Sequence, residues 1–408
     1  MKKFFALVVS LILILSLTAC GGSDSSTDSA PASGASSADP AAKTEIVYGK
    51  SQGPYTELFE AAIVPILEEQ GYTLKGVDFS DLLTADIAGL LGVEPAGIIY
   101  TSGASESNNL AIKGIAQASR NTGRHMISTV LEHASVGGTL TALQQQGWEV
   151  DLLDIQRDGT IDLEQLGDLL RKDTILVSVC AVDSELGTVQ PIRQITEILK
   201  DFPNCRLHVD ATQAIGKTEL VMDGVDTMSI APHKFYGLNG SGLLLKKSSV
   251  IIEPQIHGGS STTLYRSGTP ALALAVSIEK ALQLTLTQQE ERIRCVRQLN
   301  EYLKTALLHY PSVRINSPEG AVPHILNLSV QGLKGTVFQR VLSERGVCVS
   351  VKSACSAEGT PSKAVFAVSG DRKNALSSWR VSLSHLTTRE ELDEFLQVFD
   401  QCYKELVP

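Results

Sequence analysis

Lys234 and Asp210 are the residues whose types and positions most directly suggest chemistry. Lys234 follows an apolar segment and His233, and a partly desolvated lysine near other cations can react with an aldehyde. Asp210 ends a strand-like segment that starts at Leu207, where a carboxylate would reach a ligand at the edge of an open α/β sheet. Pyridoxal phosphate needs an anion at its ring nitrogen, and Gln213 follows closely enough to contact the ring hydroxyl. Together these residues predict a site for that cofactor.

A turn of small residues offers a place for the phosphate group. The apolar segment Ile98–Thr101 breaks at Gly103, and the pattern predicts a helix that runs from there through Ile112. Small residues let backbone N–H groups approach an anion, and the helix N-terminus adds about half a positive charge. Ser105 would supply a hydroxyl donor.

A cysteine on a small, polar loop is a candidate nucleophile. Cys355 lies in the segment Val351–Gly359, and a thiol flanked by a cation such as Lys352 can ionise and attack. Cys180 lies in the apolar run Ile175–Val182 and is predicted to be an inert core residue.

Each motif taken alone also has a plainer explanation. A serine-rich turn after a strand can be an ordinary helix N-cap. A strand-end aspartate such as Asp210 can cap a loop or bind a metal, and most lysines are solvated surface charges. The four motifs are specific only as a set.

The composition fits a two-domain α/β enzyme and argues against several other classes of protein. The 408 residues include 35 basic and 45 acidic side chains, and this net charge of −10 argues against general binding of nucleic-acid backbones. Hydrophobic residues make up 43% of the chain, which argues against a disordered polyelectrolyte. The seven cysteines have no short repeated spacing, so they indicate neither a disulfide framework nor a zinc site.

The elements that must position these residues follow from the apolar periodicity. Strands are predicted at residues 97–101, 126–130, 175–182, 206–210, 226–231 and 242–247. Helical stretches between them predict a mainly parallel sheet with helices on both faces. A long helix over 271–284, with strands at 325–330 and 379–383, predicts a smaller C-terminal α+β domain.

The N-terminus has the pattern of a secretory signal. Two lysines precede apolar runs at 4–9 and 11–15, which are too short for a spanning helix of about 20 residues. The ending at Leu17–Cys20 resembles a bacterial lipobox, which implies cleavage before Cys20 and lipidation of that cysteine. An uncleaved anchor or a mistaken start site are the alternatives. Residues 21–43 are small and polar, apart from Lys43, and predict a flexible linker.

Residues 44–86 have a short β-α-β pattern. Strands are predicted at Glu45–Gly49 and Leu74–Phe79, with a helix between them at Tyr55–Gln70. This segment resembles the opening of the NlpA/MetQ family of methionine-binding lipoproteins. A binding protein of that family needs two lobes, and the later sequence does not supply them. We therefore do not expect free-standing methionine binding.

From residue 87 onward the motifs together resemble those of the NifS/IscS cysteine desulfurases of the class V aminotransferase family. The resemblance includes Glu185–Thr188, Gln255–Gly259 and Arg266–Thr269. It implies the PLP-dependent transferase fold type I, an α/β fold with a seven-stranded-type sheet, in a large domain at 87–265 and a small domain at 266–408. It also implies pyridoxal 5'-phosphate as cofactor, L-cysteine as substrate and a sulfur-acceptor protein, either an iron–sulfur scaffold or a tRNA-thiolation protein.

The resemblance also implies roles for individual positions. Lys234 would bind the cofactor aldehyde, His133 would stack on the ring and move protons, and Cys355 would take sulfur as a persulfide. Arg380 would grip the substrate carboxylate with a bidentate pair. Thr269 would reach the phosphate from a second subunit, which implies a homodimer. The implied cofactor-binding residues are Ala104, Ser105, His133, Ser184, Asp210, Gln213, His233, Lys234 and Thr269.

The chain departs from the family pattern in ways that predict a weakened site. Ala231 and Pro232 replace a serine and a glycine, and Asp183 with Ser184 replaces an Asn-Asn pair. A lost hydrogen bond to a charged group costs about 1.5–3 kcal/mol. The family's opening Asn-Ala-Ala-Thr-Thr segment has no counterpart, and the lipoprotein-like part stands in its place, joined near 84–89.

The sequence leaves more than one hypothesis open for the junction and for the function. The junction is either a natural fusion or the product of a rearrangement. The first functional hypothesis is a cysteine desulfurase, impaired or not. The alternatives are a non-catalytic exported lipoprotein and another fold-type I enzyme, such as a selenocysteine lyase. The signal predicts a lipid-anchored protein outside the cytoplasm, whereas the resemblance is to a cytoplasmic family.

Overall fold

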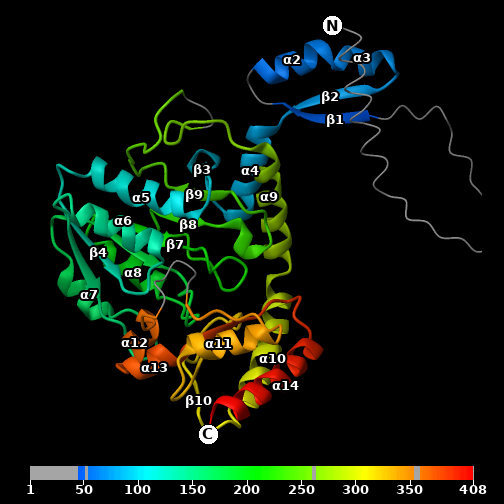
Figure 1. Cartoon of the computed structure of the whole chain (residues 1–408). Coiled ribbons are helices and arrows are strands. Elements are labelled where there is room, and N and C mark those ends of the chain that lie inside the picture. Colours follow the sequence, from blue (N-terminus) through cyan, green and yellow to red (C-terminus); the bar gives the residue numbers. More distant parts are fainter. Residues whose placement is uncertain (1–44, 51–53, 260–262, 353–358, 408) are drawn as a thin grey trace, which may run out of the picture. The chain divides into compact units, whose positions relative to one another are not determined.

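The computed structural model describes residues 45–50, 54–259, 263–352 and 359–407, which are shown in colour in Figure 1. The predicted signal and linker, with Cys20, and the predicted nucleophile Cys355 lie outside the described residues. The chain divides into two compact units, one ending at Lys75 and one made chiefly of residues 76–408. Of the helices in the described ranges, none is long and apolar enough to cross a membrane.

Residues 45–78 contain the predicted β-α-β pattern, with one difference in its helix. The elements of this segment in chain order are β1 (Glu45–Lys50), α2 (Pro54–Ala62), α3 (Val64–Glu69) and β2 (Thr73–Asp78). The single helix predicted over 55–70 is wrong, because α2 and α3 are separated at Ile63. Pro65 in the first turn of α3 has no N–H with which to continue the hydrogen bonds of α2.

The second unit is built around a large mixed sheet. Seven strands of the described chain form it, in the order β3-β9-β8-β7-β6-β4-β5. They are β3 (Ile98–Thr101), β4 (His125–Thr129), β5 (Glu149–Leu153), β6 (Thr174–Cys180), β7 (Arg206–Asp210), β8 (Thr227–Ile230) and β9 (Gly242–Lys246). Neighbouring strands from β8 to β5 are parallel, whereas β9 is antiparallel to both β8 and β3. The predicted mainly parallel sheet is confirmed.

Helices cover both faces of this sheet because the strands bury side chains on both sides. On one face, Ile99 packs in a cluster with α5 (Ala104–Ala118) and α6 (Ala134–Gln144). Its neighbour Ile98 points to the opposite face and joins a second cluster. The helices of that second face are α4 (Phe79–Leu91), α7 (Leu163–Leu169), α8 (Ile192–Leu199) and α9 (Leu272–Thr287). Burial on both faces is typical of parallel strands.

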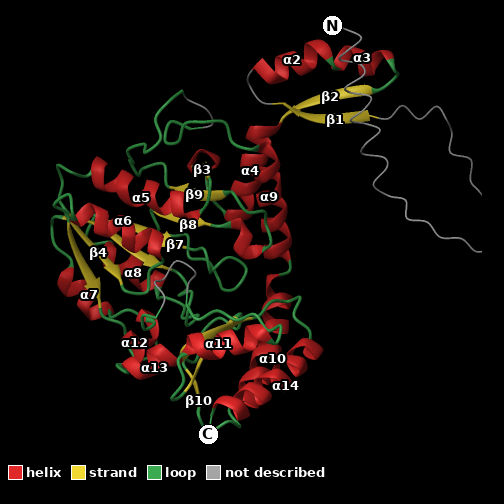
Figure 2. Ribbon diagram, viewed as in Figure 1, coloured by secondary structure: helices red, strands yellow, loops and turns green. Residues whose placement is uncertain are grey.

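A smaller α+β part follows α9, and Figure 2 shows its helices packed around short strands. The prediction that this part includes the long helix over 271–284 is wrong, because that helix is α9 and packs on the large sheet. The elements of the smaller part are α10 (Gln289–Leu307), β10 (Val313–Ile315), β11 (Ile325–Val330), α11 (Gly335–Glu344), α12 (Lys363–Ser369), α13 (Arg372–Ser377), β12 (Ser378–Ser382) and α14 (Arg389–Leu406). Its described strands pair antiparallel in the order β10-β11-β12. The stacked rings of Phe338 and Trp379, 5.5 Å between centroids, lie in its core with Phe399.

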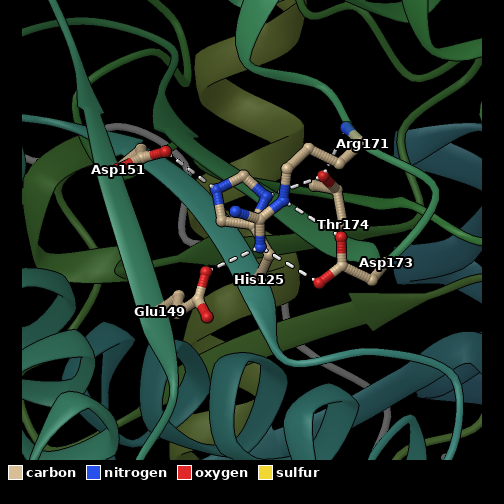
Figure 3. Close-up of polar contacts among 6 residues, drawn as sticks. All are labelled: His125, Glu149, Asp151, Arg171, Asp173 and Thr174. Carbon is tan, nitrogen blue, oxygen red and sulfur yellow. Dashed lines mark hydrogen bonds and ion pairs between the residues drawn. The ribbon is translucent and has the colours of Figure 1, made fainter.

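Polar contacts hold the edge strand β5, which the sequence pattern does not predict. Only the last residue of β5 is buried, so the strand lacks an apolar signature. Figure 3 shows the buried His125 between Thr174 Oγ1, 2.7 Å from its Nδ1, and Asp151 Oδ2, 3.1 Å from its Nε2. Arg171 adds a contact of 2.7 Å to Glu149. This network joins the amino-terminal ends of β4, β5 and β6, and it leaves the carboxyl ends for the site.

Candidate active site

A cleft of about 1570 Å³ opens at the carboxyl ends of the sheet strands. Cys180 and Asp210, the last residues of β6 and β7, lie in its wall. Arg340 of α11 and Arg380 of β12 line it from the smaller α+β part. Ligands of open α/β sheets bind at this edge, so the cleft is where the predicted site should be.

Lys234 lies on the turn that follows β8. This turn is the short 3₁₀ helix η2 (Pro232–Phe235), and Tyr236 ends it in a left-handed conformation with φ of 74°. A Cβ on Gly237 would lie 2.7 Å from the Pro232 Cβ, so the chain leaves the turn at a residue without a side chain. His233 and Lys234 both line the cleft, and burial, followed by the charge of Lys234, lowers the pKa of His233.

Asp210 is held at the end of β7 by two donors. Its Oδ1 accepts the backbone N–H of Thr212 at 2.9 Å, and its Oδ2 accepts Asn108 Nδ2 at 2.8 Å. These contacts fix the direction of the carboxylate in the cleft wall. Asn108 belongs to the helix after the predicted phosphate turn, so the ring-binding and phosphate-binding parts of the site are in direct contact.

The predicted phosphate turn is formed between β3 and α5. Gly103 precedes the helix with φ of 154°, and Ala104 and Ser105 of the first turn of α5 line the cleft. Glu106 accepts the backbone N–H of Ser102 at 2.7 Å and pairs with Arg266 at 2.9 Å. The turn thus presents the N-terminus of a 15-residue helix to the cleft, which favours an anion there.

Two further cations lie close to Lys234. Lys217 donates from Nζ to Gln213 Oε1 at 2.6 Å, and burial, then the charges of Lys234 and Arg380, lowers the pKa of Lys217 to about 7. Arg380 donates from Nη1 to the Ser184 carbonyl, while its buried Nε has no partner among the described residues. Lys234 therefore has the cationic surroundings that the sequence reasoning required of a reactive lysine.

Buried carboxyl groups lie beneath the same cleft. Glu132 Oε1 accepts the Cys180 N–H and the Thr129 hydroxyl, both at 2.9 Å, and burial raises the pKa of Glu132 to about 8. Burial likewise raises the pKa of Asp183 to about 7, and that of the Cys180 thiol well above its usual value. Cys180 is thus a protonated thiol, as predicted for an inert core residue.

Most of the predicted site residues meet in this cleft. Those that line it are Ala104, Ser105, His133, Ser184, Asp210, Gln213, His233, Lys234 and Arg380. Thr269 does not, because it lines a separate hollow of about 190 Å³ beside β3 and α9. Cys355 lies outside the described residues, but Lys352 and Gly359 on either side of that gap line the cleft.

Sequence reasoning missed Asn108, Lys217 and Glu132. Asn108 lies in the helix predicted after the phosphate turn, yet its spacing does not indicate that its amide reaches Asp210. Lys217 lies four residues after Gln213, a separation at which side chains meet on a helical turn. Glu132 directly precedes His133, and its burial depends on packing against β6, which sequence does not show.

Comparison with known proteins identifies the family. Residues 81–395 match the class-V aminotransferase family. The chain belongs to this family. Its relatives include the NifS/IcsS protein homolog of Lactobacillus delbrueckii subsp. bulgaricus, 39% identical over 324 residues, which are 78% of this chain and 84% of that protein. The cysteine desulfurase IscS of Dictyoglomus turgidum is 35% identical over 325 residues, 78% of this chain and 82% of that protein.

Solved structures of the family agree with the fold. A NifS-like protein superposes with a TM-score of 0.75 at 32% identity, covering 80% of this chain and 88% of that one. SspA in complex with cysteine superposes with a TM-score of 0.66 at 30% identity, covering 76% and 88%. The predicted fold type I is therefore confirmed.

The cleft residues fit pyridoxal phosphate, the cofactor of this family. Thr212 Oγ1 and Arg380 Nε are buried polar atoms with no partner among the described residues, and both residues line the cleft. Asp210 can face a ring nitrogen and Lys234 can supply the amine. The first turn of α5 can hold the phosphate. The predicted cofactor is confirmed.

Proposed function

We propose that this protein is a pyridoxal phosphate-dependent cysteine desulfurase, which converts L-cysteine to L-alanine and takes the sulfur as a persulfide on Cys355. One observation carries the proposal: Lys234, Asp210, His133 and Arg380 come from four separate segments and meet in one cleft. Each has the chemistry that this reaction needs. The relatives named cysteine desulfurases add support, since the similarity extends over most of both chains.

Arg380 would bind the carboxylate of the substrate. Its Nη1 is fixed by the Ser184 carbonyl, and its buried Nε leaves a second donor for a bidentate pair. Where the family has an amide beside this arginine, Ser184 offers a shorter hydroxyl and a backbone carbonyl. Substrate binding would therefore depend on Arg380 more strongly in this protein than in relatives that have the amide.

Lys234 and His133 would handle protons around the substrate. Pyridoxal phosphate, when bound, supplies the electron sink that makes the substrate's α-carbon acidic. Lys234 lies in the cleft near Lys217 and His233, and its amine would accept a proton from the substrate. His133, at the start of α6, faces the same cleft and can return a proton to the substrate carbon. Asp210 would hold the charge of the ring nitrogen.

The sulfur transfer balances without an external oxidant. The Cys355 thiolate attacks the substrate sulfur, the new S–S bond forms and the substrate C–S bond breaks. The electron pair of the broken bond stays on the substrate carbon and is protonated, which gives alanine. Cys355 thereby becomes a persulfide. Lys352 and Gly359, which stand on either side of the segment that contains Cys355, both line the cleft.

The assembly and the location of the protein are further parts of the proposal. Thr269 lines a hollow outside the main cleft of its own chain, so its contact with the phosphate would be made in the cleft of a second subunit of a homodimer. A sulfur-acceptor protein would then remove the persulfide sulfur. Cys20 would carry a lipid anchor, and the NlpA/MetQ-like segment would stand between that anchor and the enzyme.

The experiment supplies the purified protein with pyridoxal phosphate and L-cysteine and quantifies alanine. Wild-type protein should be yellow, and alanine should appear in proportion to the cysteine consumed. Lys234→Ala should lose both colour and activity, whereas Lys247→Ala, which changes an exposed lysine at the opposite edge of the sheet, should keep both. A colourless wild-type protein that forms no alanine would sink the proposal, and activity on selenocysteine alone would identify a different lyase.

A further inference from the structure

Asn108 connects two parts of the site that the proposed mechanism treats separately. It is fully buried in α5. Its Nδ2 donates to Asp210 Oδ2 at 2.8 Å and to Ser135 Oγ at 2.9 Å. An amide nitrogen has two hydrogens, so both are used. One side chain thus contacts the end of β7 and the start of α6.

The orientation of the Asn108 amide is fixed by a contact to its oxygen from His208. His208, also fully buried, contacts Asn108 Oδ1 through Nε2 at 3.0 Å and Thr227 Oγ1 through Nδ1 at 2.9 Å. Burial lowers the pKa of His208 to about 4, so the ring carries one proton at neutral pH. Asn108 Oδ1 can only accept, so that proton lies on Nε2 and Thr227 donates to Nδ1.

Ser135 links Asn108 to His133, because it contacts both side chains. The backbone N–H of Ser135 donates to His133 Nδ1 at 3.2 Å, so this nitrogen acts as an acceptor. The Ser135 hydroxyl lies 2.9 Å from the same Nδ1. Because Nδ1 acts as an acceptor, the hydroxyl hydrogen of Ser135 is directed to it, while the oxygen accepts from Asn108. The proton of a neutral His133 ring then lies on Nε2.

We propose that Asn108 is a positioning residue that holds Asp210 and His133 in one hydrogen-bonded relay, which Ser135 completes. The inference rests on the proposed function, in which both residues act on the same cofactor ring. The relay runs from Thr227 through His208 and Asn108, and from there to Asp210 and, through Ser135, to His133. It holds the Asp210 carboxylate and the His133 imidazole in a fixed relative orientation. It also leaves Nε2 of His133 as the atom that exchanges a proton.

The relay can be tested in the protein without cofactor. Nitrogen-15 NMR of labelled histidine rings reports which nitrogen carries the proton, with signals assigned through the variants H133Q and H208Q. We expect both His133 and His208 to carry it on Nε2. In Asn108→Leu, His208 should populate both tautomers, whereas Asn109→Leu, a matched change one residue along α5, should leave it unchanged. A proton on Nδ1 of His133 or His208 in the wild type would overturn the relay.

Turnover tests the consequence of the relay. Losing a hydrogen bond to a charged group should lower kcat of Asn108→Leu by about 10- to 100-fold, with KM for cysteine changed less than about twofold. Ser135→Ala, which removes one hydroxyl, should lower kcat less. The double variant should lose less than the product of the two single losses, since both interrupt one relay.

The outcomes separate this inference from the proposed function. If the wild type forms alanine and Asn108→Leu is equally active, the relay has no role and the function stands. If the two losses multiply independently, Asn108 and Ser135 are not coupled and the inference fails. If the wild type forms no alanine, the proposed function fails, and the NMR result still decides whether the relay exists.

Discussion

At the scale of single residues, the site is defined by charged groups that the fold removes from water. Lys217, Arg380, Glu132 and Asp183 all have pKa values moved by burial, and they lie in or next to the wall of the cleft. Such shifted groups cluster at functional sites because the protein must hold them against their cost in solvation. Two of them, Arg380 and Glu132, give direct predictions.

Replacing Arg380 with lysine should weaken substrate binding. Lysine keeps the charge but cannot form the fork that pairs with a carboxylate through two parallel hydrogen bonds. We expect KM for L-cysteine to rise about 10- to 100-fold, with the visible spectrum of the bound cofactor unchanged. Steady-state kinetics with the matched variant Arg314→Lys, on the exposed strand β10, provides the control. An unchanged KM would remove Arg380 from the substrate site.

Glu132 should make the stability of the protein depend on pH. Its pKa is raised from 4.5 to about 8 by burial, so the folded state holds this proton more tightly than the unfolded state does. The stabilisation is complete below about pH 4.5 and is lost as the pH rises through about 8. The difference in unfolding free energy between wild type and Glu132→Gln should therefore fall across that range, by at most about 1.4 kcal/mol per pH unit. Urea unfolding of cofactor-free protein measures it, and a constant difference would contradict the buried neutral acid.

The sequence predicts the residues of this site that stand in strong local patterns. Asp210 ends a strand-like segment, His233 and Lys234 follow another, and strand ends meet at one edge of a parallel sheet. Asn108 and Lys217 could not be predicted, because their roles depend on burial between elements distant in the chain.

At the scale of elements, the turn between β3 and α5 depends on a close crossing of two backbones. A Cβ on Gly242, the first residue of β9, would lie 2.5 Å from the carbonyl carbon of Gly103. Strand β9 pairs with β3 through Thr101 and Gly242, so the phosphate turn rests directly on the neighbouring strand. Side-chain size at Gly242 therefore controls the shape of the phosphate site.

Gly242→Ala should weaken cofactor binding by displacing this turn. Overpacking of this kind costs about 1–3 kcal/mol, and we expect the dissociation constant for pyridoxal phosphate to rise at least about tenfold. Gly138→Ala is the matched control, because nothing lies within 4 Å of its Cβ in α6. That change should keep affinity and add up to about 1 kcal/mol of stability. Equal cofactor affinity in both variants, measured by titration of the yellow colour, would contradict the account.

Periodicity predicts buried elements better than edge elements. The strands from β6 to β9 lie within a few residues of their predicted bounds, because nearly all of their residues are buried and apolar side chains recur along each strand. Strand β5 was not predicted, because polar contacts from His125 and Arg171 hold it and it lacks an apolar pattern. The break between α2 and α3 was also missed, although Pro65 marks it.

At the scale of the whole molecule, the enzyme and the N-terminal unit are separate bodies. The family match begins at residue 81, and α4 belongs to the enzyme because Leu83, Ile87 and Leu91 are buried in its core. Helix α4 also spans the junction near 84–89 that the sequence suggested. The region before it has its own strands and helices.

Removing residues 1–75 should leave the enzyme intact. We expect this shortened protein to keep the cofactor colour and the alanine-forming activity, because the core of the second unit is retained. A longer deletion, of residues 1–92, also removes α4. It exposes the surface of α9 that α4 covers and should prevent folding. Circular dichroism and cofactor titration on both proteins check this. Loss of colour in the shorter deletion would show that the first unit supports the site.

The most direct test of the central claim follows the sulfur atom. Purified protein loaded with pyridoxal phosphate is mixed with one equivalent of L-cysteine, and mass spectrometry of the intact and digested chain is compared with released alanine. We expect one added sulfur atom on the peptide that contains Cys355 for each alanine formed. Cys355→Ala should gain no sulfur, whereas Cys348→Ala should behave as wild type. Alanine formed at the normal rate by Cys355→Ala, or sulfur found on another cysteine, would contradict it.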